Sequence, residues 1–78
     1  MTRHCKIYFK HFDYGEQDVI PCEICGRRAV DIHHIHGRGR GKDVIENLMA
    51  LCRICHRKAH EKLRPDVVQA IHNKKLNQ

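Results

Sequence analysis

Residues 22–60, CEICGRRAVDIHHIHGRGRGKDVIENLMALCRICHRKAH, contain two Cys-x2-Cys pairs that are separated by 26 residues. The pairs Cys22/Cys25 and Cys52/Cys55 supply four soft thiolates, which is the number that closes a tetrahedral Zn²⁺ shell. A closed shell leaves no position for a substrate, so we expect a structural zinc whose binding energy is folding energy. Two redox-active pairs are the alternative, but matched pairs in one small chain suit a single tetrahedral site better.

The chain is short and poor in large apolar side chains, so we expect a bound metal rather than an extensive hydrophobic core to stabilise its fold. At 78 residues it fits one domain, residues 1–78, and only 5% of its residues are aromatic. Domains of this size leave much apolar surface wet and usually need a metal or disulfides. No stretch resembles a secretory signal or the ~20 apolar residues of a membrane span, so we expect a cytoplasmic protein with reduced thiols. Cys5 lies outside the pairs and is expected to be a small core residue.

Basic residues dominate the charge of the chain, with a formal net charge of +6 and a pI of about 9.3. A polyanion is the natural partner of such a chain, and we expect nucleic acid, first of all double-stranded DNA, and no membrane contact. The alternative for any single basic residue is a solvated surface charge. Those near the histidines are the candidates for binding the nucleic-acid backbone: Arg38, Arg40, Lys42, Arg53, Arg57 and Lys58.

The hydrophobic spacing predicts helix, knuckle, strand, basic Gly/Arg loop, strand, helix and helix, which is an α+β order. Val67, Val68 and Ile71 are the expected apolar stripe of the last helix. The expected ranges are a helix over 3–13, a zinc knuckle at 22–26, a strand from Arg28 to His34, a strand over 47–51, a helix over 52–63 and a helix over 65–76.

Two histidines of the predicted helix after Cys52 are candidate metal ligands. His56 follows Cys55, and the step of about 100° around a helix turns its ring away from the zinc that Cys55 would hold. His60 lies four residues further on, so the two imidazoles share a face and can grip one divalent ion. The alternative is that both are ordinary surface residues.

Three more histidines, His33, His34 and His36, lie where the first strand enters the Gly/Arg loop, and packing does not readily explain such a cluster. Adjacent residues of a regular strand point to opposite faces, so His33 and His34 cannot both aim at one ion. We therefore expect the strand to end or bulge there. One histidine could then ligate a metal while the other takes a proton from water, because imidazole titrates near neutrality.

These motifs resemble an HNH endonuclease that carries an added four-cysteine zinc site. The resemblance spans residues 22–60 and rests on Asp31-Ile32-His33-His34-Ile35, on Asn47-Leu48 and on Cys52-Arg53-Ile54-Cys55-His56-x3-His60. It implies a small ββα-metal domain, also called a His-Me finger and similar to a treble clef, flanked here by an N-terminal and a C-terminal helix. The spacing His34-x12-Asn47-x8-His56-x3-His60 is also similar to that of the colicin-type nucleases.

The resemblance implies a role for each matching residue. His34 matches the general base, His33 and His56 match ligands of a catalytic divalent metal, and Asn47 matches the residue that orients the loop or the base. His60 matches a third ligand in the colicin-like branch only. The extra His36 is an alternative base or a phosphate contact, and the position of Asn47 favours His34.

The resemblance implies metal-dependent hydrolysis of DNA phosphodiester bonds, which leaves 5′-phosphate and 3′-hydroxyl ends. Many relatives have Asp where His33 stands, and an all-imidazole shell shifts the preference from Mg²⁺ toward Mn²⁺, Ni²⁺ or Zn²⁺. The rival hypothesis is a non-catalytic, zinc-dependent nucleic-acid-binding module. A partner protein or a dimer could supply targeting, and the family is frequent in phages and mobile elements.

Overall fold

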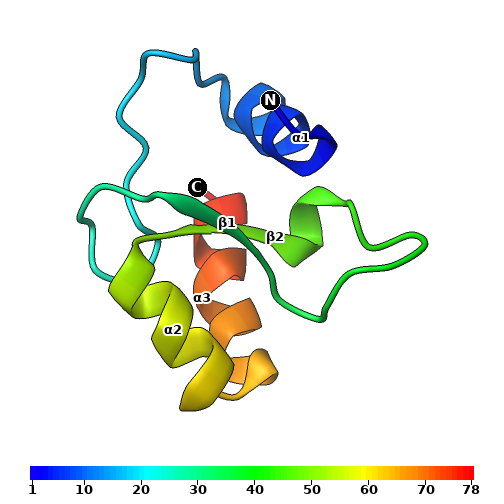
Figure 1. Ribbon diagram of the computed structural model, residues 1–78, viewed down its shortest axis with the longest axis vertical. Coiled ribbons are helices and arrows are strands. Elements are labelled where there is room, and N and C mark those ends of the chain that lie inside the picture. Colours follow the sequence, from blue (N-terminus) through cyan, green and yellow to red (C-terminus); the bar gives the residue numbers. More distant parts are fainter.

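A two-stranded antiparallel sheet lies at the centre of the computed structural model, which describes residues 1–78 (Figure 1). Strand β1 spans Asp31–His34 and strand β2 spans Leu48–Leu51. The loop between them ends in a short 3-10 turn, η1 (Ile45–Asn47), and extends to one side of the sheet in Figure 1. This loop follows the paired histidines directly, so its conformation shapes their surroundings.

The register of the sheet separates the two histidines of β1. His33 lies opposite Met49, and His34 lies opposite Leu48. Directly paired residues of antiparallel strands share a face, and consecutive residues face opposite sides. His33 and His34 are therefore presented to different layers of the molecule.

Helix α1 (Arg3–Phe12) covers one face of the sheet. The side chain of Thr2 caps its start by accepting a hydrogen bond from the backbone N–H of Cys5 at 3.4 Å. Asp13 ends the helix in the left-handed conformation, with φ 60° and its N–H donating to the Lys10 carbonyl. Tyr8 is fully buried beneath the helix.

Helices α2 (Arg53–Glu61) and α3 (Pro65–Leu76) lie on the opposite side of the sheet from α1 (Figure 1). Cys52 caps α2, because its sulfur accepts a hydrogen bond from the backbone N–H of Cys55. Pro65 occupies the first turn of α3, where its missing N–H costs nothing. None of the three helices has the length and apolar character needed to cross a membrane.

Every residue of β2 is buried, because the strand contributes to an apolar cluster on each face. Leu48 and Ala50 pack under α1, whereas Met49 and Leu51 pack under α2 and α3. The α1 cluster is completed by Tyr8 and Ile20, with Ile7, Phe9, Phe12, Tyr14, Ala29, Ile32 and Ile45 around them. The cluster under α2 and α3 contains Cys22, Ile35, Cys52, Cys55 and Val68, with Ile24, Ala59, Leu63 and Ile71 around them.

The predicted α+β class and the ββα arrangement are confirmed, since β1, β2 and α2 follow one another around the cysteine cluster. Helix 65–76 has the predicted bounds, while the others end early: α1 stops at Phe12 and α2 runs over Arg53–Glu61. In the last helix only part of the predicted stripe is internal, since Val68 is buried but Val67 is 45% exposed.

Both strands are shorter than predicted. Arg28 and Ala29 do not extend β1, because Arg28 forms a bridge with Pro21 and the N–H of Ala29 donates to the Ile20 carbonyl, whereas Val30 still donates to the Leu51 carbonyl of β2. These bonds hold Arg28 and Ala29 against Ile20 and Pro21, the residues just before the cysteine knuckle. Asn47 lies in η1 rather than in β2, because its side chain is engaged by the preceding loop.

The expected end of β1 at these histidines is confirmed, because the strand ends at His34, and it does so without a bulge. Both residues are paired in regular register with β2. Their partners Leu48 and Met49 lie in separate apolar clusters on the two faces, so the two histidines still face opposite sides of the sheet. Cys5 is half-buried at the edge of α1 rather than part of either core cluster.

Candidate metal centres and active site

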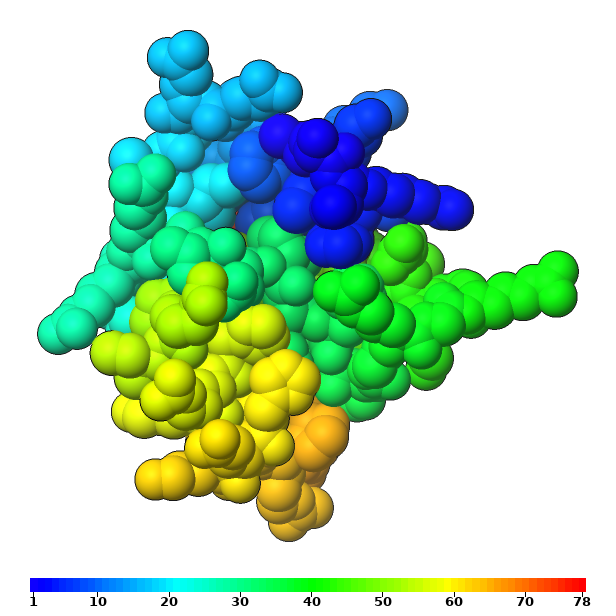
Figure 2. Space-filling model, in the orientation of Figure 1, coloured from blue at the N-terminus to red at the C-terminus, as the bar shows by residue number.

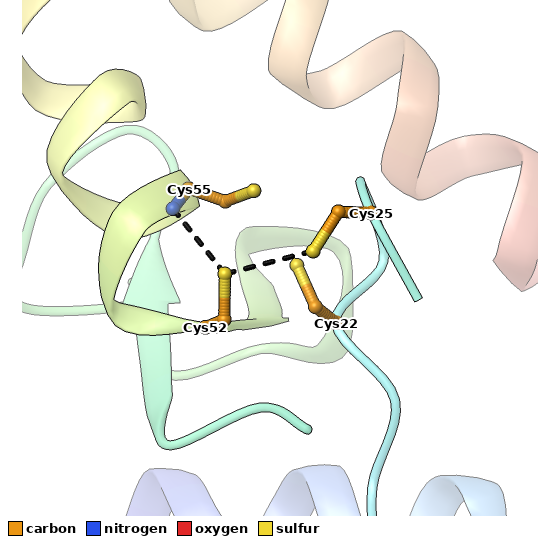
Figure 3. A group of neighbouring side chains, drawn as sticks. All are labelled: Cys22, Cys25, Cys52 and Cys55. Atoms are coloured by element: carbon orange, nitrogen blue, oxygen red, sulfur yellow. Dashed lines mark hydrogen bonds between the residues drawn. The ribbon is translucent and has the colours of Figure 1, made fainter. Parts of the chain in front are cut away.

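The two cysteine pairs meet between the knuckle and the start of α2, and the four side chains point toward one another (Figure 3). All four sulfurs lie within 4.8 Å of one another, and those of Cys25 and Cys52 are 3.6 Å apart. Tetrahedral Zn–S bonds of 2.3 Å put sulfurs roughly 3.8 Å apart. The donor set and its spacing are therefore those of a structural zinc site.

The close packing of the thiols affects their ionisation. The backbone N–H of Cys55 and the neighbouring thiols lower the pKa of Cys52 to about 7, against the opposing effect of burial. Burial and the same neighbours raise the pKa of Cys55 to about 12. Four thiolates packed this closely repel one another, so all four can ionise only around a cation.

A second group of donors lies on the face of β1 that carries His33. The rings of His33, His56 and His60 have centroids 4.8 to 4.9 Å apart, and their ligand atoms lie within 4.8 Å of one another. The Nε2 atoms of His56 and His60 are 3.1 Å apart, which fits two imidazoles that share one small cation. The predicted pair on α2 and the strand histidine thus converge.

Asp31 orients one of these histidines. Its Oδ2 lies 3.0 Å from Nδ1 of His56 and 3.1 Å from Nε of Arg53. Because the carboxylate can only accept, it holds the proton on Nδ1 and leaves Nε2 free for a metal. Such a carboxylate–histidine pair is the usual support of a metal-binding imidazole.

His33 is suited to ligation rather than to proton transfer near neutrality. It is 5% exposed, and burial together with the adjacent His56, His60 and His34 lowers its pKa to about 4. A ring that stays neutral keeps a lone pair for a metal at every physiological pH.

Asn47 fixes the loop that follows the strand histidines. Its side chain is buried, accepts a hydrogen bond from the N–H of His36 at 2.7 Å and donates to the carbonyls of Gly37 and Lys42 at 3.1 and 2.9 Å. Asn47 thus closes both ends of the glycine-rich loop. Its contacts are with the loop backbone and not with the ring of His34.

His34 occupies the other face of β1, beneath α1. Its Nε2 is 2.8 Å from Oδ1 of Asp43, and its ring packs against His4 with centroids 4.8 Å apart and planes 71° apart. His36, the alternative base, is exposed and turns away to Gln69 of α3, at 3.0 Å.

One hollow of about 310 Å³ nevertheless reaches both histidine groups. His34 is the last residue of β1 and lies at the strand end where the loop leaves the sheet. The hollow is lined by Ile32, His33, His34, Gly37, Arg38, His56 and His60. A phosphate that enters it meets imidazoles and a guanidinium.

The six basic candidates differ in position. Arg38 lines the hollow, and Arg53 pairs with Asp31 while its side chain stays 73% exposed. The side chains of the loop segment project far beyond the body of the molecule (Figure 2). The exposed candidates on that loop and on α2 are Arg40, Lys42, Arg57 and Lys58.

Sequence reasoning assigned no role to Asp31, Asp43 or His4. The alternation of β1 puts Asp31 on the same face as His33, so its place beside the metal ligands could have been inferred. No local pattern indicates Asp43 or His4, because the loop and the docking of α1 bring them to His34.

A family model described as HNH endonuclease matches residues 22–62. No curated protein and no solved structure matches the chain. The matched segment is more than half of the chain and contains both cysteine pairs, the strand histidines, Asn47 and the histidines of α2. With the ββα arrangement around the cysteine cluster, this match shows that the chain belongs to the HNH endonuclease family.

Proposed function

We propose that the chain is a metal-dependent endonuclease that hydrolyses phosphodiester bonds of double-stranded DNA. The main observation in support is the shared hollow, which brings His34 and Arg38 to the same opening as the His33, His56 and His60 donors. A nuclease site needs a base, a cation and a phosphate-binding group within reach of one phosphate. A module that only binds DNA does not require three converging imidazoles beside the imidazole of His34.

The three histidines fit a divalent cation because their donors converge and Asp31 holds the proton of His56 on the remote nitrogen. A cation bound there would neutralise charge on the phosphate and on the departing oxygen. His33 and His56 are the principal ligands in this proposal, with His60 as the third. An all-nitrogen shell favours Mn²⁺, Ni²⁺ or Zn²⁺ over Mg²⁺.

His34 acts as the general base. It takes a proton from water as the water oxygen bonds to phosphorus, and the bond from phosphorus to the 3′ oxygen breaks. The departing oxygen takes up a proton from solvent, so the products end in 5′-phosphate and 3′-hydroxyl. Asn47 holds the loop that carries Arg38, and Arg38 orients the phosphate in the hollow.

The remaining basic residues position DNA without reading its sequence. Backbone contacts from Lys and Arg fix the register of a duplex but carry no base information. A chain with these contacts alone should cut with low sequence specificity, and a partner protein or a second copy would supply targeting. The basic residues are Arg40, Lys42, Arg53, Arg57 and Lys58.

Cleavage of supercoiled plasmid tests the proposal. Zinc-loaded protein is incubated with Mg²⁺, Mn²⁺, Ni²⁺ or Zn²⁺, with an EDTA control, beside His56→Ala and the matched variant His11→Ala at an exposed histidine of α1. We expect metal-dependent nicking that is lost in His56→Ala and kept in His11→Ala. A folded protein that shifts DNA but does not cleave it with any of these cations would favour the binding module instead.

A further inference from the structure

His34 is held from two sides by residues that the nuclease proposal has not used. Asp43 lies at the end of the glycine-rich loop, and His4 lies in the first turn of α1, outside the segment that matches the family. We infer that Asp43 and His4 are positioning residues for His34, which fix its tautomer and its ring plane. This inference rests on the proposed function, because it assigns His34 the role of base.

The tautomer follows from the chemistry of the contact. A carboxylate oxygen can only accept a hydrogen bond, so at 2.8 Å Nε2 of His34 must carry the proton. In the neutral ring Nδ1 then keeps its lone pair, which is the form that can remove a proton from water. The hydrogen bond with His34 lowers the pKa of Asp43, against the opposing effect of burial, so the carboxylate stays ionised.

Asp43 is placed by the same side chain that closes the loop. Asn47 donates to the carbonyl of Lys42 at 2.9 Å, and the peptide it holds leads directly into Asp43. Asn47 therefore reaches His34 through the loop and Asp43 rather than by direct contact. This gives a physical reason for a buried asparagine at the base of the loop.

His4 is placed by the anchoring of α1. It precedes Tyr8 by four residues, so both side chains lie on one face of the helix. Tyr8 is fully buried and donates a hydrogen bond to Glu23 at 2.6 Å, which fixes that face against the sheet. The edge-on packing of His4 against His34 then restricts rotation of the His34 ring.

The donor atoms of His4, His34 and Asp43 also lie within 4.8 Å of one another, so a cation is a rival occupant of this cluster. A cation there would occupy a nitrogen of His34 and stop cleavage. The positioning role is favoured over a cation site because Nε2 of His34 and Oδ1 of Asp43 are 2.8 Å apart, which is a direct hydrogen-bond distance that needs no bridging ion.

A double-mutant cycle tests the inference. Single-turnover cleavage of saturating DNA is measured for wild type, Asp43→Ala, His34→Ala and the double variant, with exposed Glu16→Ala as the matched loss of a carboxylate. General-base catalysis contributes about 10²- to 10⁴-fold, so we expect Asp43→Ala to lower the rate constant about 10- to 100-fold with DNA affinity unchanged. In the His34→Ala background the same change should have no further effect, because Asp43 acts only through His34.

Each result separates the inference from the proposed function. Equal losses from Asp43→Ala in both backgrounds, or no loss in either, would overturn the inference while leaving the nuclease intact. Full activity of His34→Ala would overturn the proposed function and the inference with it. His4→Phe keeps an aromatic edge and should retain more activity than His4→Ala. Inhibition by added Zn²⁺ in wild type that is relieved in His4→Phe would identify a cation site and overturn the inference.

Discussion

The histidines of this chain differ in function because their ring nitrogens face different partners. His56 turns Nδ1 to Asp31 and keeps Nε2 for the convergent donors. His72 has an acceptor at both nitrogens, Glu23 at 2.7 Å and the Ile45 carbonyl at 2.7 Å, so both must donate. The first arrangement suits a neutral metal ligand, and the second suits a buried cation.

Asp31→Ala should weaken binding of the catalytic metal. Without the carboxylate the proton of His56 is free to move to Nε2, and loss of such a support costs about 10- to 100-fold in metal affinity. Calorimetric titration of Mn²⁺ or Ni²⁺ into zinc-loaded protein measures the change.

Arg53→Ala is the control for that experiment, because it removes the other partner of Asp31 and leaves the Asp31–His56 contact in place. Equal metal affinity in wild type and Asp31→Ala would mean that Asp31 serves only its ion pair with Arg53.

At the scale of elements, helix α2 serves both metal sites. Cys52 and Cys55 at its start contribute to the four-cysteine cluster, and His56 and His60 point from another side to His33. A zinc ion in the four-cysteine cluster would therefore fix the helix that carries the proposed catalytic ligands.

Removal of the structural zinc should unfold the chain. Zinc binding contributes about 10–16 kcal/mol in small zinc domains, which is as large as the whole stability of about 5–15 kcal/mol expected of a domain. We expect Cys22→Ser, or a strong chelator, to abolish the cooperative thermal transition seen by circular dichroism. Cys5→Ser removes a thiol outside the cluster and should keep both the zinc and the transition. A folded, zinc-free Cys22→Ser protein would contradict this prediction.

The sequence predicted most of the elements because their signals are local. Cysteine spacing, the i, i+4 histidines and Pro65 at a helix start all act within a few residues. The start of β1 was missed because Arg28 and Ala29 pair with the chain before the knuckle, which is a tertiary preference. Strand alternation alone correctly separated His33 from His34, and of the expected end or bulge the strand shows the end, at His34.

The candidate site was predicted less completely than the fold. The four cysteines and the pair His56 and His60 were identified from spacing and His33 from the family resemblance, and the structure brings each set together. His4 and Asp43 were not identified, because their contacts with His34 depend on how α1 docks and how the loop folds. Such tertiary contacts produce no periodic pattern in the sequence from which they could be predicted.

At the scale of the whole molecule, a buried polar network joins segments that are distant in sequence. Glu23 of the knuckle accepts from Tyr8 of α1 and from His72 of α3, and the carboxylate is 1% exposed. Burial alone would lower the pKa of His72, but its hydrogen bonds with Glu23 and Ile45 and the Glu23 charge raise it above the ordinary value.

Stability should therefore fall as pH rises. The folded pKa of His72 lies above its unfolded value of about 6.5, so the contribution is fully present below pH 6.5 and is lost as pH rises through the folded pKa. Urea unfolding of wild type and His72→Gln should give a free-energy difference that shrinks as the pH is raised above the unfolded value of about 6.5. The pH dependence of zinc binding is common to both proteins and cancels in the difference. A difference that does not change with pH would show that His72 is not charged in the folded protein.

The basic surface should make DNA binding salt-dependent. Arg38 lines the hollow, and removal of one phosphate contact lowers the slope of log affinity against log salt by about 1. Arg38→Ala should weaken binding to unrelated duplexes by similar factors, measured by fluorescence anisotropy over a salt series. Lys74→Ala, an exposed cation of α3, is the matched control. An unchanged slope in Arg38→Ala would remove Arg38 from the DNA contact.

The single-turnover rate of duplex cleavage by His34→Ala tests the central claim most directly. Wild type and variant are compared at equal zinc content, at saturating Mn²⁺ and with all DNA bound, so that only the chemical step differs. We predict a rate about 10²- to 10⁴-fold lower in the variant, with zinc content and DNA affinity unchanged. Cleavage at the wild-type rate would contradict a nuclease that uses His34 as its base.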